Sequence, residues 1–282
     1  MHLSPILIED AVKAALKEDL GHGFDVTSNV LIPAGARARA VIRSREEGVL
    51  AGLIVALSAF SLTDIDFDMT VHAEDGMKLE AGQIIAEIEG PARSLLMAER
   101  VALNYLGHMS GIASLTARFV EEIQDTGAEI CDTRKTLPGL RLFQKYAVYV
   151  GGGCNHRFGL DDAILIKDNH IAVAGGINEA LDQAYMLAGH TRKIEIEVDT
   201  PAQLDEVLEN GKADIVMLDN FSIEDLNKAV KICKGRITTE ASGGVNLERV
   251  RKIAQSGVDY ISSGSLTHSA PNLDIGLDVE NS

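Results

Sequence analysis

Residues 194–219, IEIEVDTPAQLDEVLENGKADIVMLD, contain the pattern that decides the fold. Two short apolar runs, at 194–198 and 215–218, are typical of buried strands, and residues 201–208 between them have the periodicity of a helix. A strand, a helix and a second strand in this order predict two parallel strands joined by a right-handed crossover, with the helix outside the sheet.

The same alternation continues on both sides of this segment. Strand-like runs fall at residues 129–131, 163–166, 194–198, 215–218, 236–239 and 260–261, and helix-like segments fall at 176–188, 201–208, 223–233 and 247–255. Runs at this spacing predict an α/β fold, namely an open parallel α/β barrel of about six or seven strands. We assign residues 111–271 to this barrel domain.

The first part of the chain predicts a smaller domain of another kind. Residues 5–20 form an expected helix, with a Ser-Pro pair at its start and a glycine after its end. Residues 36–44 alternate like a half-exposed strand, and residues 67–90 contain short strands separated by glycine turns. These elements predict an α+β sandwich domain at residues 1–110.

A longer helix is expected at residues 91–111. One stripe along it is apolar, and the opposite stripe carries Arg100, Gly107 and Gly111. The polar and small residues of this second stripe favour a solvent-facing surface. Glycines on one helical face also suit a place where another surface approaches closely, so both interpretations stay open on the pattern alone.

Composition excludes several classes of protein. Apolar residues make up 46 % of the 282, which is enough for packed cores, and no apolar run is long enough to span a bilayer. The first residues lack the basic and apolar regions of a signal peptide, so we expect a cytoplasmic protein. Cys131, Cys154 and Cys233 form no CxxC pair, and their odd number predicts three reduced thiols.

Positive charge is concentrated in residues 131–171. This stretch holds six Lys or Arg and four Asp, a balance of +2, whereas the rest of the chain holds 20 basic and 38 acidic residues, a balance of −18. A nucleic-acid-binding protein would spread positive charge over a whole face. A focused cationic cluster in an acidic chain predicts instead a small, multiply charged anionic substrate.

Polar groups follow the predicted strands at their carboxyl ends. They are Asp132-Thr133-Arg134-Lys135, Lys167-Asp168-Asn169-His170, Glu197, Asp219-Asn220, Glu240 with Ser242-Gly243-Gly244, and Ser263-Gly264-Ser265. Loops converge at that end of a barrel, and barrel enzymes build their active sites there. The sequence therefore predicts an active site formed by these segments.

The groups divide by their chemistry. Arginine, lysine and histidine donors suited to carboxylates or phosphates are Arg134, Lys135, His156, Arg157 and Lys167. Glu197 and Asp219 are hard oxygen ligands that suit Mg²⁺, although a salt bridge to a nearby cation is the alternative for each. The two Ser-Gly segments near residues 243 and 264 precede helices, where main-chain N–H groups bind phosphate well.

Several motifs together resemble one family. They are DTRKT, GGG-NHR, LIKDNH, LDNF, ASGG and GSLTHS, and in this order they resemble quinolinate phosphoribosyltransferases over essentially the whole chain. The resemblance implies an enzyme that makes nicotinate mononucleotide, CO₂ and pyrophosphate from quinolinate and phosphoribosyl pyrophosphate with Mg²⁺, on the route to NAD. It also implies a homodimer, and a C-terminal tail, residues 272–282, that joins the N-terminal domain.

The resemblance implies roles for individual residues. Arg134, His156, Arg157 and Lys167 would hold the two quinolinate carboxylates, with Thr133 and Lys135 beside them. Arg100 would come from the partner subunit, which favours the close-approach interpretation of its helical stripe. Glu197 and Asp219 would hold Mg²⁺, and with Lys135 and Lys167 they are the expected catalytic residues. The expected cradle of the 5-phosphate is Ser242, Gly243, Gly244, Ser263 and Gly264, with His268 in the neighbouring segment.

Two alternatives remain at this point. The paralogous pyrophosphorylase encoded with molybdate transport genes shares the DTRKT and GGG-HR elements but lacks LIKDNH, which is present here at residues 165–170. A sugar-phosphate lyase or isomerase with a barrel would also use a phosphate site on the last strands. Such an enzyme would need Lys167 as its Schiff-base lysine.

Overall fold

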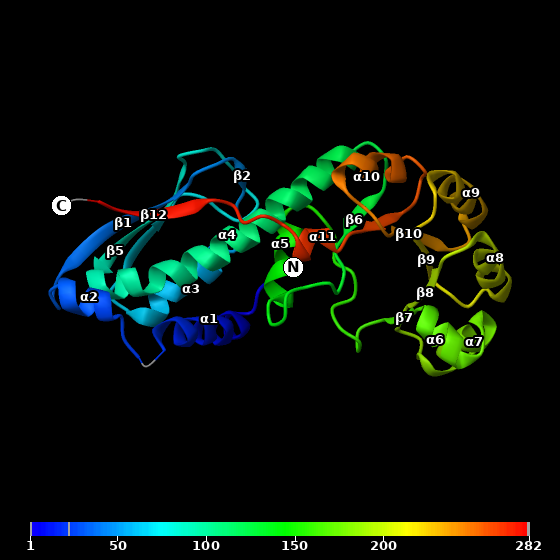
Figure 1. Cartoon of the computed structure of the whole chain (residues 1–282), viewed down its shortest axis with the longest axis horizontal. Coiled ribbons are helices and arrows are strands. Elements are labelled where there is room, and N and C mark those ends of the chain that lie inside the picture. Colours follow the sequence, from blue (N-terminus) through cyan, green and yellow to red (C-terminus); the bar gives the residue numbers. More distant parts are fainter. Residues whose placement is uncertain (1, 22, 281–282) are drawn as a thin grey trace. The chain divides into compact units, whose positions relative to one another are not determined.

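The computed structural model describes residues 2–21 and 23–280 (Figure 1). The chain forms two compact units. One contains the described residues up to 117, together with 142–152 and those from 270 on, and the other contains 118–141 and 153–269. The domain boundaries expected between residues 110 and 111 and between residues 271 and 272 stay a prediction, because a division into compact units does not by itself define domains.

The first unit is built on an antiparallel sheet with the strand order β12-β1-β5-β3. Its elements are α1 (Pro5–Leu20), α2 (Val26–Leu31), β1 (Arg37–Ser44), β2 (Gly48–Val49), α3 (Leu53–Thr63), β3 (Asp68–Val71), β4 (Lys78–Leu79), β5 (Ile84–Pro91), most of α4 (Ala92–Ile123), most of α5 (Arg141–Val150) and β12 (Ile275–Glu280). The last strand, β12, pairs with β1 from Ser44 opposite Ile275 to Arg39 opposite Glu280. The C-terminal tail therefore completes the sheet of the first unit.

Helix α4 is longer than predicted, because it continues to Ile123 instead of ending near residue 111. Gly107 and Gly111 face the C-terminal segment of the same chain. A Cβ at Gly111 would overlap the carbonyl oxygen of Pro271, and a Cβ at Gly107 would lie 3.0 Å from the carbonyl oxygen of Leu273. The solvent-facing interpretation is therefore wrong for these glycines, since they let the chain's own backbone approach the helix.

The second unit is a six-stranded parallel sheet with the order β6-β11-β10-β9-β8-β7. Its strands are β6 (Glu129–Cys131), β7 (Ile164–Ile166), β8 (Ile194–Val198), β9 (Ile215–Asp219), β10 (Thr238–Ser242) and β11 (Tyr260–Ser262). Its helices are α6 (Asp168–Ala174), α7 (Ile177–Leu187), α8 (Pro201–Asn210), α9 (Ile223–Cys233), α10 (Leu247–Ala254) and α11 (Ser265–His268). In the part of the chain that is described, β6 and β7 are not paired with each other. The predicted open parallel α/β barrel is confirmed.

Strand β10 lies further along the chain than predicted. The main-chain N–H groups of Arg236 and Ile237 donate to the carbonyl oxygen of Cys233, which closes the last turn of α9. Strand β10 therefore starts at Thr238 instead of residue 236. The strand also continues to Ser242 instead of ending at residue 239, so Glu240, which was expected just after the strand, lies in its middle.

The prediction of three reduced thiols is wrong for two of them. Cys131 and Cys154 form a disulfide, with 4.8 Å between their Cα atoms. The chain at Cys154 forms a parallel bridge to Cys131 at the end of β6, so the two residues lie side by side although 23 positions separate them. Cys233 is free and buried, and burial raises the pKa of its thiol to about 11. None of the described helices combines the length and apolar character that a membrane span requires.

Candidate active site

A cavity of about 400 Å³ lies at the carboxyl ends of the barrel strands. It is lined by Thr133, Arg134, Lys135, His156, Arg157, Leu165, Lys167, Glu197, Met217, Asp219, Glu240, Ser242 and Ser262. The structure thus brings together most of the site residues that the sequence predicted. Arginine, lysine and histidine side chains line one part of the cavity, and carboxylates from β8, β9 and β10 line the rest.

Two neighbouring guanidinium groups carry hydrogen-bonding capacity that the protein does not use. The Nε atoms of Arg134 and Arg157 are buried and have no hydrogen-bond partner among the described residues. Burial, and next the charge of Arg134, lower the pKa of Arg157. Keeping two such cations side by side destabilises the free protein, so an anion with more than one charge fits this position.

The loops that carry these donors are tied to each other. Asp132 is fully buried, and its carboxylate accepts the main-chain N–H of His156 at 3.0 Å and the side-chain amide of Asn155 at 2.6 Å. The disulfide joins the residues just before these two segments, Cys131 and Cys154. The segment after β6 and the segment after Cys154 are therefore fixed relative to each other before any ligand binds.

Both ring nitrogens of His156 already have protein partners. Its Nε2 lies 3.0 Å from a carboxylate oxygen of Glu195, and its Nδ1 accepts the main-chain N–H of Arg157 at 2.7 Å. The guanidinium of Arg157 also donates from Nη1 to the carbonyl oxygen of Ala163 at 2.9 Å. His156 lines the cavity as predicted, but in this arrangement it orients Arg157 more directly than it offers a donor.

Three carboxylates gather at the ends of β8 and β9. An oxygen from each of Glu197, Asp199 and Asp219 lies within 4.8 Å of the others. Lys167 forms an ion pair with Glu197, and the side-chain amide of Asn220 donates to Asp219 at 2.5 Å. Asp199 was not predicted, although its position two residues after Glu197 places it on the same side of the chain. The salt-bridge alternative for Glu197 is thus present beside a carboxylate cluster of the kind that Mg²⁺ uses.

The predicted phosphate segments have the backbone that such sites need. Gly243 and Gly244 have positive φ, 90° and 59°, and a Cβ at Gly243 would overlap the side-chain oxygen of Asn220. Gly264 lies against Lys135, whose Cδ would be 2.8 Å from a Cβ there. Ser242 lines the cavity. The predicted residues outside the lining are Gly243, Gly244, Ser263, Gly264, His268 and Arg100.

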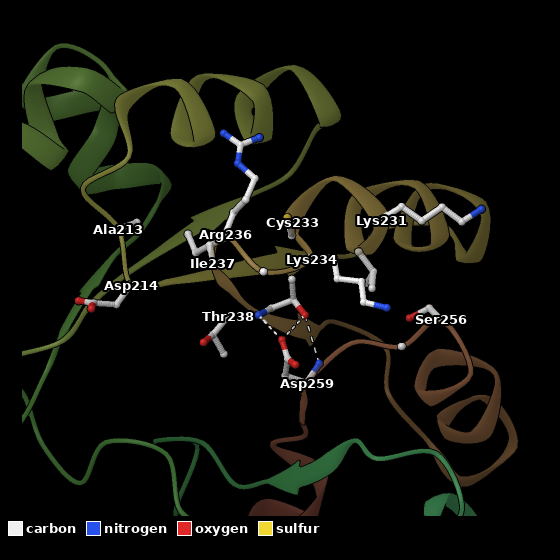
Figure 2. A pocket seen from close by; sticks show the side chains of 14 residues that line it. Ala213, Asp214, Lys231, Cys233, Lys234, Arg236, Ile237, Thr238, Ser256 and Asp259 are labelled. Carbon is white, nitrogen blue, oxygen red and sulfur yellow. Dashed lines mark hydrogen bonds between the residues drawn. The ribbon is translucent and has the colours of Figure 1, made fainter.

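A larger cavity, of about 720 Å³, lies at the opposite, amino ends of β9 to β11 (Figure 2). Its two acids are already hydrogen bonded. Asp259 accepts from the main-chain N–H and the hydroxyl of Thr239, and Asp214 accepts from the main-chain N–H of Ile194 and from Lys193. These acids therefore brace the ends of the strands.

Comparison with known proteins assigns the family. The family model described as "Quinolinate phosphoribosyl transferase, N-terminal domain" matches residues 25–110, and the corresponding C-terminal domain model matches residues 112–278. The chain belongs to the quinolinate phosphoribosyltransferase family. The motifs that suggested this phosphoribosyltransferase family are thereby confirmed, and a sugar-phosphate lyase is excluded.

Relatives of this phosphoribosyltransferase match it over nearly its whole length. The chain is 46 % identical to the "Probable nicotinate-nucleotide pyrophosphorylase [carboxylating]" of Bacillus subtilis, over 93 % of this chain and 90 % of that protein. Its structure is similar to NadC from Streptococcus pyogenes, with a TM-score of 0.94 at 44 % identity and complete coverage of both chains. The nicotinate-nucleotide pyrophosphorylase of Ehrlichia chaffeensis gives a TM-score of 0.94 at 41 % identity, over 99 % of this chain and 100 % of that chain.

Proposed function

We infer that this chain transfers the phosphoribosyl group of phosphoribosyl pyrophosphate to quinolinate, with loss of CO₂ and pyrophosphate, and so makes nicotinate mononucleotide for NAD biosynthesis. Relatives that are 40–46 % identical to this chain are named as carboxylating nicotinate-nucleotide pyrophosphorylases or as decarboxylating quinolinate phosphoribosyltransferases. The observation that carries the inference is the pair of adjacent guanidiniums with unused N–H groups, at Arg134 and Arg157, in the same cavity as the carboxylates of Glu197 and Asp219.

Quinolinate fits the donor side of the cavity by its charge. It is a pyridine with two adjacent carboxylates, and Arg134 and Arg157 each offer an unused N–H to an anion. A carboxylate on each guanidinium removes both the repulsion between the arginines and the cost of their unpaired donors. Lys135, exposed beside them, adds a third cation, and Thr133 lies at the same wall.

Mg²⁺ and the phosphosugar fit the carboxylate side. Glu197 and Asp219 would hold the ion, and Asp199 completes the cluster of hard oxygen ligands. When bound, Mg²⁺ supplies positive charge that stabilises the departing pyrophosphate. The ammonium of Lys167, now paired with Glu197, is then free to turn to a substrate carboxylate or to pyrophosphate. Main-chain N–H groups near Gly243, Gly244 and Gly264 suit the 5-phosphate.

This constellation works by positioning and electrostatics. The fixed cations hold quinolinate so that its ring nitrogen faces the anomeric carbon of the sugar, and no covalent nucleophile is required. Once the nitrogen is quaternised, the ring cation stabilises the carbanion that loss of the neighbouring carboxylate leaves. The residues assigned to these catalytic roles are Lys135, Lys167, Glu197 and Asp219.

A homodimer with Arg100 in trans extends this proposal. The Arg100 side chain is 65 % exposed, and its closest acid is its neighbour Glu99 at 3.9 Å, so the guanidinium is available to a second copy of the chain. A third arginine at the quinolinate pocket would strengthen the binding of the dianion. We also propose that the enzyme acts in the cytoplasm.

The decisive experiment combines the protein with quinolinate, phosphoribosyl pyrophosphate and Mg²⁺ and follows CO₂ and nicotinate mononucleotide. Both products should form in equal amounts. Nicotinate replaces quinolinate as the negative control, because it lacks the second carboxylate. Turnover of nicotinate without CO₂, or no turnover of quinolinate by the purified protein, would refute the proposal.

A further inference from the structure

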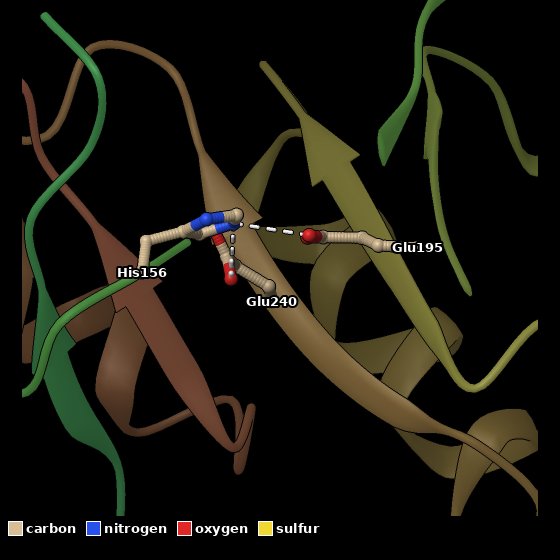
Figure 3. A group of neighbouring side chains, drawn as sticks. All are labelled: His156, Glu195 and Glu240. Atoms are coloured by element: carbon tan, nitrogen blue, oxygen red, sulfur yellow. Dashed lines mark ion pairs between the residues drawn. The ribbon is translucent and has the colours of Figure 1, made fainter. Parts of the chain in front are cut away.

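Three side chains meet at the wall of the cavity: His156, which is largely buried, and the buried Glu195 on β8 and Glu240 on β10 (Figure 3). The side chains of Glu195 and Glu240 are 6 % and 5 % exposed, and that of His156 is 11 % exposed. One oxygen of each carboxylate and one imidazole nitrogen lie within 4.8 Å of one another. Substrate and Mg²⁺ binding, as proposed above, give neither glutamate a role.

The imidazole of His156 offers a single N–H to this cluster, which is too few hydrogen-bond donors for the four carboxylate oxygens of Glu195 and Glu240. Because His156 Nδ1 accepts the main-chain N–H of Arg157, the ring proton is on Nε2. Nε2 lies 3.0 Å from Glu195 Oε2 and 3.7 Å from Glu240 Oε2, so it donates to Glu195. Within the described residues, the other oxygen of each glutamate is buried without a hydrogen-bond partner.

Two ionised carboxylates this close and this buried repel each other, and the repulsion favours a proton on one of them. Glu240 takes that proton because it is farther from the imidazole than Glu195. Burial, and next the charge of Glu195, raise the pKa of Glu240 to about 7, with a smaller contribution from Asp132, while the charge of His156 and the hydroxyl of Ser262 oppose the rise. The residues opposite Glu240 in register on the two neighbouring strands are Met217 and Tyr260.

We propose that Glu240 is a positioning residue of the phosphoribosyl transfer that acts in its neutral form. While Glu240 is neutral, Glu195 alone holds Nε2 of His156, which keeps Nδ1 on the main chain of Arg157 and the Arg157 guanidinium at the cavity. When Glu240 ionises, it competes for the same Nε2–H and adds a negative charge to the wall that faces a dianionic substrate. The inference rests on the proposed binding of quinolinate at Arg157.

The pH dependence of KM for quinolinate tests this role. Glu240 is neutral below pH 7 and ionised above it, so KM for quinolinate in the wild-type protein should rise about tenfold between pH 6 and pH 8, as one inhibitory ionisation near 7 requires. Glu240→Gln is neutral at every pH, so its KM for quinolinate, whatever its value at pH 6, should stay constant between pH 6 and pH 8. KM for phosphoribosyl pyrophosphate should show no such difference between the two proteins.

Glu209→Gln, at an exposed position on α8, is the matched control and should follow the wild-type profile.

Calorimetry in two buffers of different ionisation enthalpy provides a measurement that needs no variant. Quinolinate binding to the wild-type protein at pH 7 should take up about half a proton, since binding selects neutral Glu240. Equal pH profiles for wild type and Glu240→Gln, or binding without proton uptake, would overturn the role of Glu240. A wild-type protein that neither binds nor turns over quinolinate would instead overturn the proposed function.

Discussion

Replacing Arg134 by methionine should weaken substrate binding and stabilise the free protein at the same time. Methionine keeps the apolar stem of the side chain but removes the guanidinium. The substrate loses charge-assisted hydrogen bonds to one carboxylate, which are worth about 2–4 kcal/mol together, so kcat/KM for quinolinate should fall roughly 30- to 1,000-fold. The binding of phosphoribosyl pyrophosphate should change little.

The stability change has the opposite sign for two reasons. The buried Nε of Arg134, which has no partner among the described residues, disappears, and so does the repulsion that lowers the pKa of Arg157. Relief of one unpaired buried donor is worth about 1 kcal/mol, which raises the melting temperature by about 2–4 °C in a chain of this size. Scanning calorimetry measures the shift, and steady-state kinetics measure kcat/KM.

Arg141→Met is the matched control, because Arg141 belongs to the same cationic stretch but has its donors satisfied. It donates to the hydroxyl of Thr136 at 3.0 Å and to the carbonyl oxygen of Phe158 at 3.1 Å. Its removal should therefore lower the melting temperature. If Arg134→Met also melts lower than wild type, or binds quinolinate normally, then the reasoning from unused donors is refuted.

Three further changes have defined outcomes. Replacing Cys131 and Cys154 together by alanine opens a loop with a sequence separation of 23 and should cost about 3 kcal/mol of unfolding free energy, whereas no change in denaturant midpoint would contradict a native disulfide. Gly111→Ala forces a Cβ onto the main chain of the C-terminal segment and should cost about 1–3 kcal/mol in urea unfolding, while alanine at an exposed helical position should not. Arg100→Ala and Arg134→Met should each have much lower activity alone and should regain about a quarter of the wild-type activity when mixed as subunits, since about half of the dimers are then mixed and one site of each mixed dimer is complete. Mixtures that stay inactive would place Arg100 outside the partner's site.

The barrel was predictable because helix-like segments alternate with strands along the chain, and most of the strands contain buried apolar residues in short runs. Most strand limits deviated by no more than one residue, and the exception at residues 236–239 arose because the closing turn of α9 uses the N–H groups of Arg236 and Ile237. The charged groups after the strands were predictable for the same reason, since a polar residue at the end of an apolar run must lie at the edge of the sheet.

What the sequence did not predict depends on contacts between distant segments. The disulfide needs the loop at Cys154 to lie beside β6, and no local pattern indicates that. Glu195 alternates with apolar residues in IEIEV, which is the pattern of a solvent-facing side chain, yet in an α/β barrel, even an open one, the second face of the sheet points into the barrel. The same pattern therefore hid a buried carboxylate. Glu240 was named from the sequence, but as a residue after its strand, because β10 was predicted to end at residue 239 instead of Ser242.

In this barrel the active site is located by charged groups that lack hydrogen-bond partners within the protein, and not by the size of the cavity. The larger cavity, at the amino ends of the strands, has its acids Asp214 and Asp259 bound to neighbouring N–H groups, so they stabilise the sheet without any ligand. At the carboxyl ends, in the part of the chain described, the guanidiniums of Arg134 and Arg157 keep unpartnered N–H groups beside each other. A fold gains nothing in stability from that arrangement, and it is retained at a place where a substrate can complete the hydrogen bonds.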